Sequence, residues 1–331
     1  MRQPEPKEYI DGILSGNRTF LSRAITLVES SKAEHQDMAG QVIEGCLPHS
    51  GNSMRIGITG VPGVGKSTFI EAFGNYVITD HNRTLAILAI DPSSSKSRGS
   101  ILGDKTRMET LANNPKAYIR PSPASGSLGG VARSTRETIT LCEAAGFDTI
   151  LIETVGVGQS EIAVHSMVDF FLLLMLAGAG DELQGIKRGI MEMADAIVIN
   201  KADMGNEGAA IRARLEYKNA LHLFPPTESG WIPQTTTCSS LNNKGIKEVW
   251  DIIKEYEAFT KETGYFKEKR NQQSLYWLRE SINDGLHQAF YRDKTLKKAL
   301  EDYQSQILGG KITSHTAAKE LLNMFLDKRD R

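Results

Sequence analysis

Short runs of apolar, β-branched residues alternate with longer stretches of helical periodicity over most of the chain. Seven of these runs are strand candidates: Met54–Thr59, Thr84–Ile90, Ala117–Arg120, Asp148–Glu153, Phe170–Ala177, Ala196–Asn200 and Trp231–Thr237. Because strands of this length separated by helices form βαβ units, the pattern predicts an α/β protein with a doubly wound, mostly parallel sheet. Ligands of such sheets bind at the carboxyl ends of the strands.

Helical periodicity continues beyond the sheet at both ends of the chain. It predicts helices at Asn17–Ser30 and Asp37–Cys46 before the sheet, and at Gln272–Phe290, Thr295–Ile307 and Thr313–Leu326 after it. In the first C-terminal helix the apolar positions recur every three or four residues, at Leu275, Leu278, Ile282, Leu286 and Phe290. The C-terminal helices could cover the core or form an arm for self-association, and the pattern leaves both open.

Composition restricts the class of protein without identifying it. The 331 residues are 40% hydrophobic and 24% charged, as in ordinary globular proteins, and the formal net charge of -1 favours neither nucleic acid nor an anionic membrane as a partner. The most apolar run, Val168–Ala177, is too short for a membrane helix and predicts a buried strand. The polar, proline-containing N-terminus is unlike a signal peptide, and the three scattered cysteines suit a reducing compartment, so we expect a cytoplasmic protein.

The segment from Gly60 to Thr68 matches the phosphate-binding pattern G-x-x-x-x-G-K-[ST], and it joins a predicted strand to a helix over Thr68–Tyr76. Glycines allow backbone N–H groups to turn toward phosphates, and the helix N-terminus adds partial positive charge. Lys66 is expected to reach the β- and γ-phosphates, while the Ser67 hydroxyl binds Mg²⁺. The predicted phosphate site consists of Gly60, Val61, Pro62, Gly63, Val64, Gly65, Lys66, Ser67 and Thr68.

A later strand ends in the sequence Asn200-Lys201-Ala202-Asp203, which fits N-K-x-D. A carboxylate at Asp203 can accept hydrogen bonds from both N1–H and the exocyclic amine of guanine. Adenine presents no such pair of donors, so the motif favours GTP over ATP. The segment after the next strand is placed to close over the base, and its predicted contacts are Ser239, Ser240 and Leu241.

Magnesium prefers oxygen ligands, and several carboxylates follow strand ends on the same edge of the sheet as the phosphate site. Asp91 ends the second predicted strand, Glu153 ends the fourth, and Asp104 lies in the loop between them. The predicted metal set is therefore Ser67, Asp91, Asp104 and Glu153. The sequence Glu153-Thr-Val-Gly156 stands where many P-loop GTPases have D-x-x-G, so Glu153 is also a candidate for orienting the attacking water.

The polar, glycine-rich segment Gly178–Gly189 follows the most apolar strand. Leu183 occupies the place of the third glycine of a dinucleotide fingerprint, which excludes that interpretation. We expect a mobile loop at the catalytic edge, from which Lys187 or Arg188 could reach the phosphates. The predicted catalytic residues are accordingly Lys66, Asp104, Glu153 and Lys187.

Four longer strings make the chain resemble the MeaB/ArgK/MMAA family of GTPase chaperones, which serve adenosylcobalamin-dependent acyl-CoA mutases, chiefly methylmalonyl-CoA mutase. These strings begin at Asp91, Gly99, Glu153 and Gly180, and the resemblance extends over nearly the whole chain. It implies a homodimer held by the C-terminal helices, slow GTP hydrolysis that the mutase accelerates, and control of cobalamin loading. It also supports the magnesium and water-positioning set. The segment Ser95–Arg98 departs from the family pattern, with an added Lys and Arg.

The expected organisation has three parts: an N-terminal helical segment over 1–50, a P-loop GTPase domain over 51–262 and a C-terminal helical dimerisation arm over 263–331. The expected function is a GTP-hydrolysing chaperone of a mutase, without nucleic acid or membrane as partner. An ATP-using kinase or transport-coupled ATPase of the same fold, and a nucleotide-gated binding module with little turnover, remain alternatives.

Overall fold

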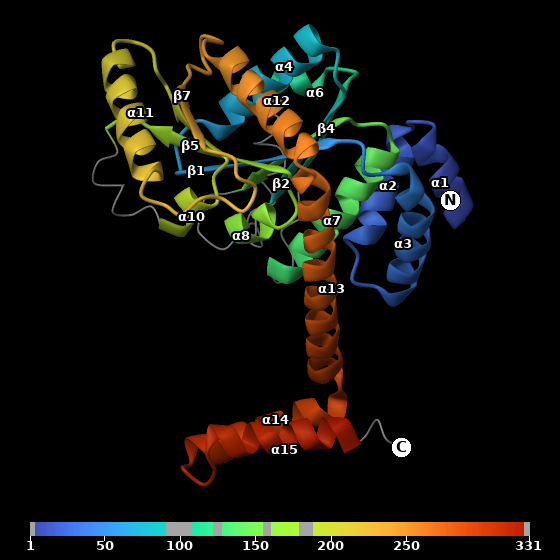
Figure 1. The fold of residues 1–331 in the computed structure, drawn as a ribbon. Helices are drawn as coiled ribbons and strands as arrows, with labels where there is room; N and C mark the ends of the chain where they lie inside the picture. The colour runs from blue at the N-terminus through green and yellow to red at the C-terminus, as the bar shows by residue number, and fades with distance from the viewer. Residues whose placement is uncertain (1–3, 91–107, 122–127, 155–159, 179–187, 328–331) are drawn as a thin grey trace. The chain divides into compact units, whose positions relative to one another are not determined.

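The computed structural model describes residues 4–90, 108–121, 128–154, 160–178 and 188–327. The chain divides into two compact units, Met1–Ser274 and Leu275–Arg331. Figure 1 shows the first unit as a sheet with helices against it, and the second as a group of helices.

A seven-stranded parallel sheet forms the centre of the first unit, in the order β3-β2-β4-β1-β5-β6-β7. This arrangement confirms the predicted doubly wound α/β fold. The strands are β1 (Met54–Gly60), β2 (Leu85–Ile90), β3 (Ala117–Pro121), β4 (Thr149–Thr154), β5 (Phe170–Leu176), β6 (Ala196–Asn200) and β7 (Gln234–Thr237). The predicted start of β7 at Trp231 was wrong, because Pro233 has no N–H for a sheet ladder and the Trp231 indole instead donates to the Asp195 carbonyl at 3.0 Å.

Helices cover both faces of the sheet, and the five inner strands are almost fully buried, whereas the edge strands β3 and β7 are only partly buried. On one face, α4 and α12 pack with Ile56, Ile58 and neighbouring apolar residues in the largest core cluster. On the other, α11 packs against alternate residues of β5 and β6, including Leu173 and Ile197. The helices of this layer system are α4 (Lys66–His81), α6 (Glu109–Ala112), α7 (Leu128–Ala144), α8 (Ser160–His165), α10 (Arg188–Glu192), α11 (Glu207–Leu221) and α12 (Ile246–Glu262).

Three N-terminal helices pack against one another and against α7: α1 (Pro6–Leu14), α2 (Arg18–Val28) and α3 (Ala33–Cys46). The sequence pattern did not predict α1. Its proline stands at the first helical position, where no N–H is needed, and Glu5 and Glu8 form a reciprocal capping box at its start. The two helices that were predicted begin within four residues of the expected positions.

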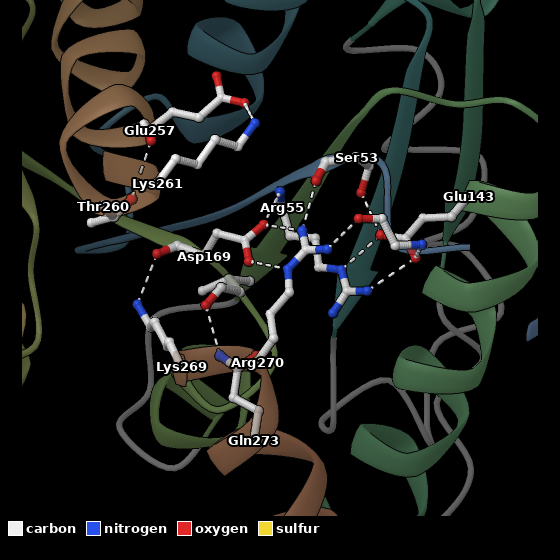
Figure 2. Close-up of polar contacts among 12 residues, drawn as sticks. Ser53, Arg55, Glu143, Asp169, Glu257, Thr260, Lys261, Lys269, Arg270 and Gln273 are labelled. Atoms are coloured by element: carbon white, nitrogen blue, oxygen red, sulfur yellow. Dashed lines mark hydrogen bonds and ion pairs between the residues drawn. The ribbon is translucent and has the colours of Figure 1, made fainter. Parts of the chain in front are cut away.

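The beginning of α13 (Tyr265–Arg292) is held by charged groups at the amino-terminal edge of the sheet, as Figure 2 shows. Arg270 forms a two-pronged ion pair with Asp169, the residue before β5, and Lys269 donates to the Asp169 carbonyl at 2.8 Å. Next to this pair, Arg55 of β1 donates twice to Glu143 of α7. Hydrogen-bonded ion pairs therefore connect α7 and α13 to the starts of two strands. They lie at the edge of the sheet opposite to the predicted phosphate site.

The second unit contains the rest of α13, with α14 (Lys294–Leu308) and α15 (Ser314–Asp327). Leu296, Ala317 and Leu321 are buried, and the rings of Phe290 and Phe325 meet edge to face at 5.4 Å. The predicted apolar stripe of α13 is largely exposed, with Leu275 at 58%, Leu278 at 57%, Ile282 at 53% and Leu286 at 49%. The chain's own described residues thus leave this stripe uncovered.

No helix in the described parts of the chain is both long enough and apolar enough to cross a membrane.

Candidate nucleotide-binding site

The predicted phosphate loop joins β1 to α4 at the carboxyl edge of the sheet, next to β4 and β5. Two of its glycines occupy positions that a larger residue would not fit. A Cβ on Gly60 would lie 2.4 Å from the Leu174 carbonyl oxygen, and Gly65, at the N-cap of α4, has a φ of 91°. Val64 is fully buried and fixes the loop to the core, while Pro62 and Gly63 are exposed. The loop therefore presents its backbone at the start of α4, with Ser67 and Thr68 in the first turn of that helix.

Lys66 is the first residue of α4, and its Nζ reaches back to the start of the loop, where it donates to the Gly60 carbonyl at 2.9 Å. Burial lowers the pKa of this ammonium, and the negative charges of Glu153 and Glu161 oppose that shift. Two carboxylates therefore lie within electrostatic range of Lys66. Only Glu153 was expected there from the sequence.

Asn200, at the end of β6, connects the predicted base site to the phosphate loop. Its Nδ2 donates to the Val64 carbonyl at 2.9 Å. Its Oδ1 accepts from the backbone N–H of Ser240 at 3.2 Å and from the Ser240 hydroxyl at 2.8 Å. Asn200 is buried, so these bonds replace water and hold three segments in a fixed arrangement.

Lys201 and Asp203 follow Asn200 on a tight turn. Lys201 has a φ of 58° and donates from Nζ to the Gly63 carbonyl at 2.8 Å, so its stem crosses toward the phosphate loop. Asp203 accepts a hydrogen bond from the Ser239 hydroxyl, which orients its carboxylate. Leu241 is 63% exposed beside this cluster. The structure thus brings together all of the predicted base-site residues and links them to the phosphate loop.

Glu153 is paired in register with Ile58 of β1 and Ala89 of β2, near the carboxyl edge of the sheet. Its carboxylate and the Ser67 hydroxyl are the kinds of oxygen ligand that Mg²⁺ takes, so the described part of the predicted metal set fits that ion. The other predicted residues of this set, Asp91 and Asp104, and the candidate catalytic Lys187 lie outside the described residues.

Two residues of the site were not predicted from the sequence. Cys238 is buried, and its Sγ donates to the Asn200 Oδ1 at 3.3 Å. Glu161, in the first turn of α8, is fully buried. No single-sequence signal points to Cys238, because a buried cysteine is usually a small apolar core residue. Glu161 lies eight residues after Glu153, and only its burial distinguishes it from an ordinary helix-start acid.

Several known proteins are similar to this chain over almost all of its length. A protein of Mycobacterium tuberculosis named a probable GTPase is 47% identical over 319 residues, which are 95% of this chain and 95% of that protein. The mouse mitochondrial methylmalonic aciduria type A homolog is 43% identical over 324 residues, covering 95% of this chain and 78% of that protein. A solved structure described as LAO/AO transport system kinase has a TM-score of 0.77 and 35% identity, covering 98% of this chain and 99% of that one.

The sequence model of one family, described as methylmalonyl-CoA mutase-associated GTPase MeaB, matches residues 21–295. This range includes the phosphate loop, the base motif and the whole sheet. The chain belongs to the MeaB family of GTPases.

Proposed function

We propose that this GTPase is a chaperone that gates cofactor loading and protects or reactivates an adenosylcobalamin-dependent acyl-CoA mutase. The client that we propose is methylmalonyl-CoA mutase, which the family description names. The main structural support is the position of Asn200. It links the base motif to the phosphate loop and to Ser240 by hydrogen bonds. A nucleotide that shifts the base-binding segments would therefore also shift the phosphate loop.

In the proposed reaction the protein acts by positioning and electrostatics, and no side chain forms a covalent intermediate. Backbone N–H groups of the segment Gly60–Thr68, to which Pro62 contributes none, hold the phosphates, Lys66 contacts their oxygens, and Asp203 accepts from the guanine. Ser67, Asp91, Asp104 and Glu153 would hold Mg²⁺, which supplies charge neutralisation at the β- and γ-phosphates. Glu153 orients the attacking water, and Lys187 approaches the phosphates when the mutase is bound.

We also propose the three-part organisation over residues 1–50, 51–262 and 263–331, in a cytoplasmic protein whose last part forms a homodimer. The exposed stripe of α13 supports the dimer, because four large apolar side chains stay in water unless a second copy covers them. The reducing compartment is supported by three cysteines that are buried as free thiols.

The decisive experiment measures GTP hydrolysis by the purified chain with and without adenosylcobalamin-loaded methylmalonyl-CoA mutase. We expect the mutase to raise the rate, and ATP to be a poor substitute for GTP. Lys66→Ala should abolish turnover in both conditions. A rate that the mutase leaves unchanged would refute the chaperone role, and equal use of ATP would favour the kinase or ATPase alternative. Single-turnover hydrolysis near zero would favour a nucleotide-gated binding module.

The dimer has its own test. The double variant Leu278→Asp and Ile282→Asp places two charges on the stripe, and we expect light scattering to show a monomer where the parent chain is a dimer. Leu223→Asp is the matched control, because Leu223 is 81% exposed in the other unit. A parent chain that is monomeric, or a double variant that stays dimeric, would contradict this assignment.

A further inference from the structure

Glu161 is a buried acid to which the proposed reaction gives no role. It stands in the first turn of α8 and has no exposed surface, and the adjacent Ser160, equally buried, donates from Oγ to its Oε2 at 3.3 Å. An acid at this position of a helix normally interacts with the helix dipole from the surface, where it remains hydrated. Burial of a carboxylate costs free energy unless the group is paired and hydrogen-bonded, so the charges near Glu161 are the question.

The packing of α8 shows where the Glu161 side chain is directed. On β1, a Cβ at Gly57 would lie 2.9 Å from Val164 of α8 and 2.9 Å from Phe171, so α8 sits close against the strand at this glycine. Glu161 precedes Val164 by three residues and therefore lies on the same face of the helix. Because α8 follows the carboxyl end of β4 and leads to the amino end of β5, its first turn is the end nearer to the phosphate loop.

The same reasoning places Glu161 near the last residues of β1. Thr59 shares the face of Gly57, since side chains alternate along a strand, and it accepts from the Thr154 hydroxyl at 2.8 Å. One residue later, the Gly60 carbonyl holds the Lys66 ammonium. The negative charge of Glu161 acts on Lys66, in accord with this placement. A buried carboxylate thus lies behind the phosphate loop, on the side of the sheet that α8 covers.

We propose that Glu161 is a positioning residue that draws the Lys66 ammonium toward the sheet and opposes the charge of the nucleotide, and so sets the affinity for GTP relative to GDP. This inference rests on the proposed phosphate site. A carboxylate walled off from water interacts strongly with charges nearby, because the surrounding protein screens it less than solvent does. It competes with the phosphates for Lys66 and repels them. GTP carries one more negative charge than GDP, so the repulsion weakens GTP binding more.

The test uses Glu161→Gln, which removes the charge with little change in shape. Affinities for GDP and for a non-hydrolysable GTP analogue are measured by fluorescence titration of the full chain with Mg²⁺ present. We expect the analogue to bind roughly tenfold more tightly than to the parent, an effect of the size that one charge exerts at intermediate dielectric, with a smaller gain for GDP. The KM for GTP should fall in parallel. Glu161→Asp keeps the charge, so its ratio of GTP-analogue affinity to GDP affinity should be closer to the parental value than that of Glu161→Gln.

Glu216→Gln is the matched control, because Glu216 is an exposed acid on α11 and the same charge is removed far from the loop. A purely structural role for Glu161 would lower the melting temperature and weaken both nucleotides equally. That outcome, or an unchanged affinity ratio in a folded Glu161→Gln protein, would overturn the inference. Lys66→Ala separates the two proposals: if it abolishes turnover while Glu161→Gln leaves the ratio unchanged, the phosphate site stands and only the role of Glu161 fails.

Discussion

Arg270 holds Asp169 with two parallel hydrogen bonds, Nε to Oδ1 at 2.7 Å and Nη2 to Oδ2 at 2.6 Å. Both side chains are largely withdrawn from water, with 15% and 2% of their surface exposed. The guanidinium also donates from Nη1 to the Gly51 carbonyl and from Nη2 to the Ser53 carbonyl, so each of its three nitrogens donates to the segments that precede β1 and β5. The beginning of α13 is therefore built into the sheet edge (Figure 2).

Replacing Arg270 by alanine should destabilise the protein severely. The change leaves the buried Asp169 carboxylate without its partner, which typically costs about 3–5 kcal/mol. Chemical denaturation measures the loss. Arg270→Lys should also be destabilising, since an ammonium cannot reproduce the two-pronged contact. Lys247→Ala serves as the control: Lys247 pairs with Asp251 on the exposed surface of α12, where solvent screens the pair, and its loss should leave stability nearly unchanged. Equal effects of the two alanine variants would show that burial of the pair is unimportant.

Gly57→Ala should push α8 away from β1. The new methyl group would meet Val164 and Phe171 at 2.9 Å, and these side chains belong to a closely packed core. We expect a loss of about 1–3 kcal/mol in the free energy of unfolding, together with an altered GTP KM, because α8 contains Glu161. Gly40→Ala is the counterpart in the interior of α3, where nothing lies within 4 Å of the added Cβ. That variant should gain roughly 0.5–1 kcal/mol, and a loss similar to that of Gly57→Ala would contradict the steric argument.

Asp203→Asn should reduce the discrimination between guanine and other bases. The carboxylate accepts from two donors of guanine, and hydrogen bonds to a charged group contribute roughly 1.5–3 kcal/mol each. We therefore expect the affinity for GDP to fall about ten- to a hundredfold while binding of the xanthine nucleotide improves. Ser239 orients the carboxylate, so Ser239→Ala should weaken GDP binding by a smaller factor. Unchanged preference for guanine in Asp203→Asn would rule out this role for Asp203.

His165, the last residue of α8, should make the protein less stable in acid. Burial, with a smaller effect of the Lys269 charge, lowers the pKa of His165 to about 4 from its ordinary value of 6.5. Between these values the unfolded chain binds a proton that the folded protein does not. The contribution of His165 to stability is therefore complete above pH 6.5 and is lost as the pH falls toward 4. The largest possible loss is about 3 kcal/mol at 1.4 kcal/mol per pH unit.

Unfolding curves recorded from pH 8 to pH 4 for the parent and for His165→Asn test this expectation. The difference between the two proteins should be constant above pH 6.5 and should shrink below it, because the variant has no ring to protonate. A difference that stays constant down to pH 4 would mean that the folded protein accommodates the charged imidazole.

The sequence predicted the strands well because each is a short apolar run bounded by turn residues, and it predicted the nucleotide motifs because both depend on local spacing. Gly60, Gly65 and Lys66 lie within a span of seven residues, so a linear pattern captures them. The helix α1 was not predicted because the N-terminal residues are polar and contain proline, although proline at a first helical position is well tolerated.

The amino-acid sequence alone determined the order of strands along the chain, the phosphate loop and the guanine motif, since hydrophobic periodicity and backbone requirements are local. Only the tertiary structure decided which distant groups meet. Asn200 lies 136 residues from Val64 and Arg270 lies 101 residues from Asp169, and these pairs meet only when the strands and helices pack together. Burial is likewise a property of the fold, and it alone distinguishes Glu161 from a common helix-start acid.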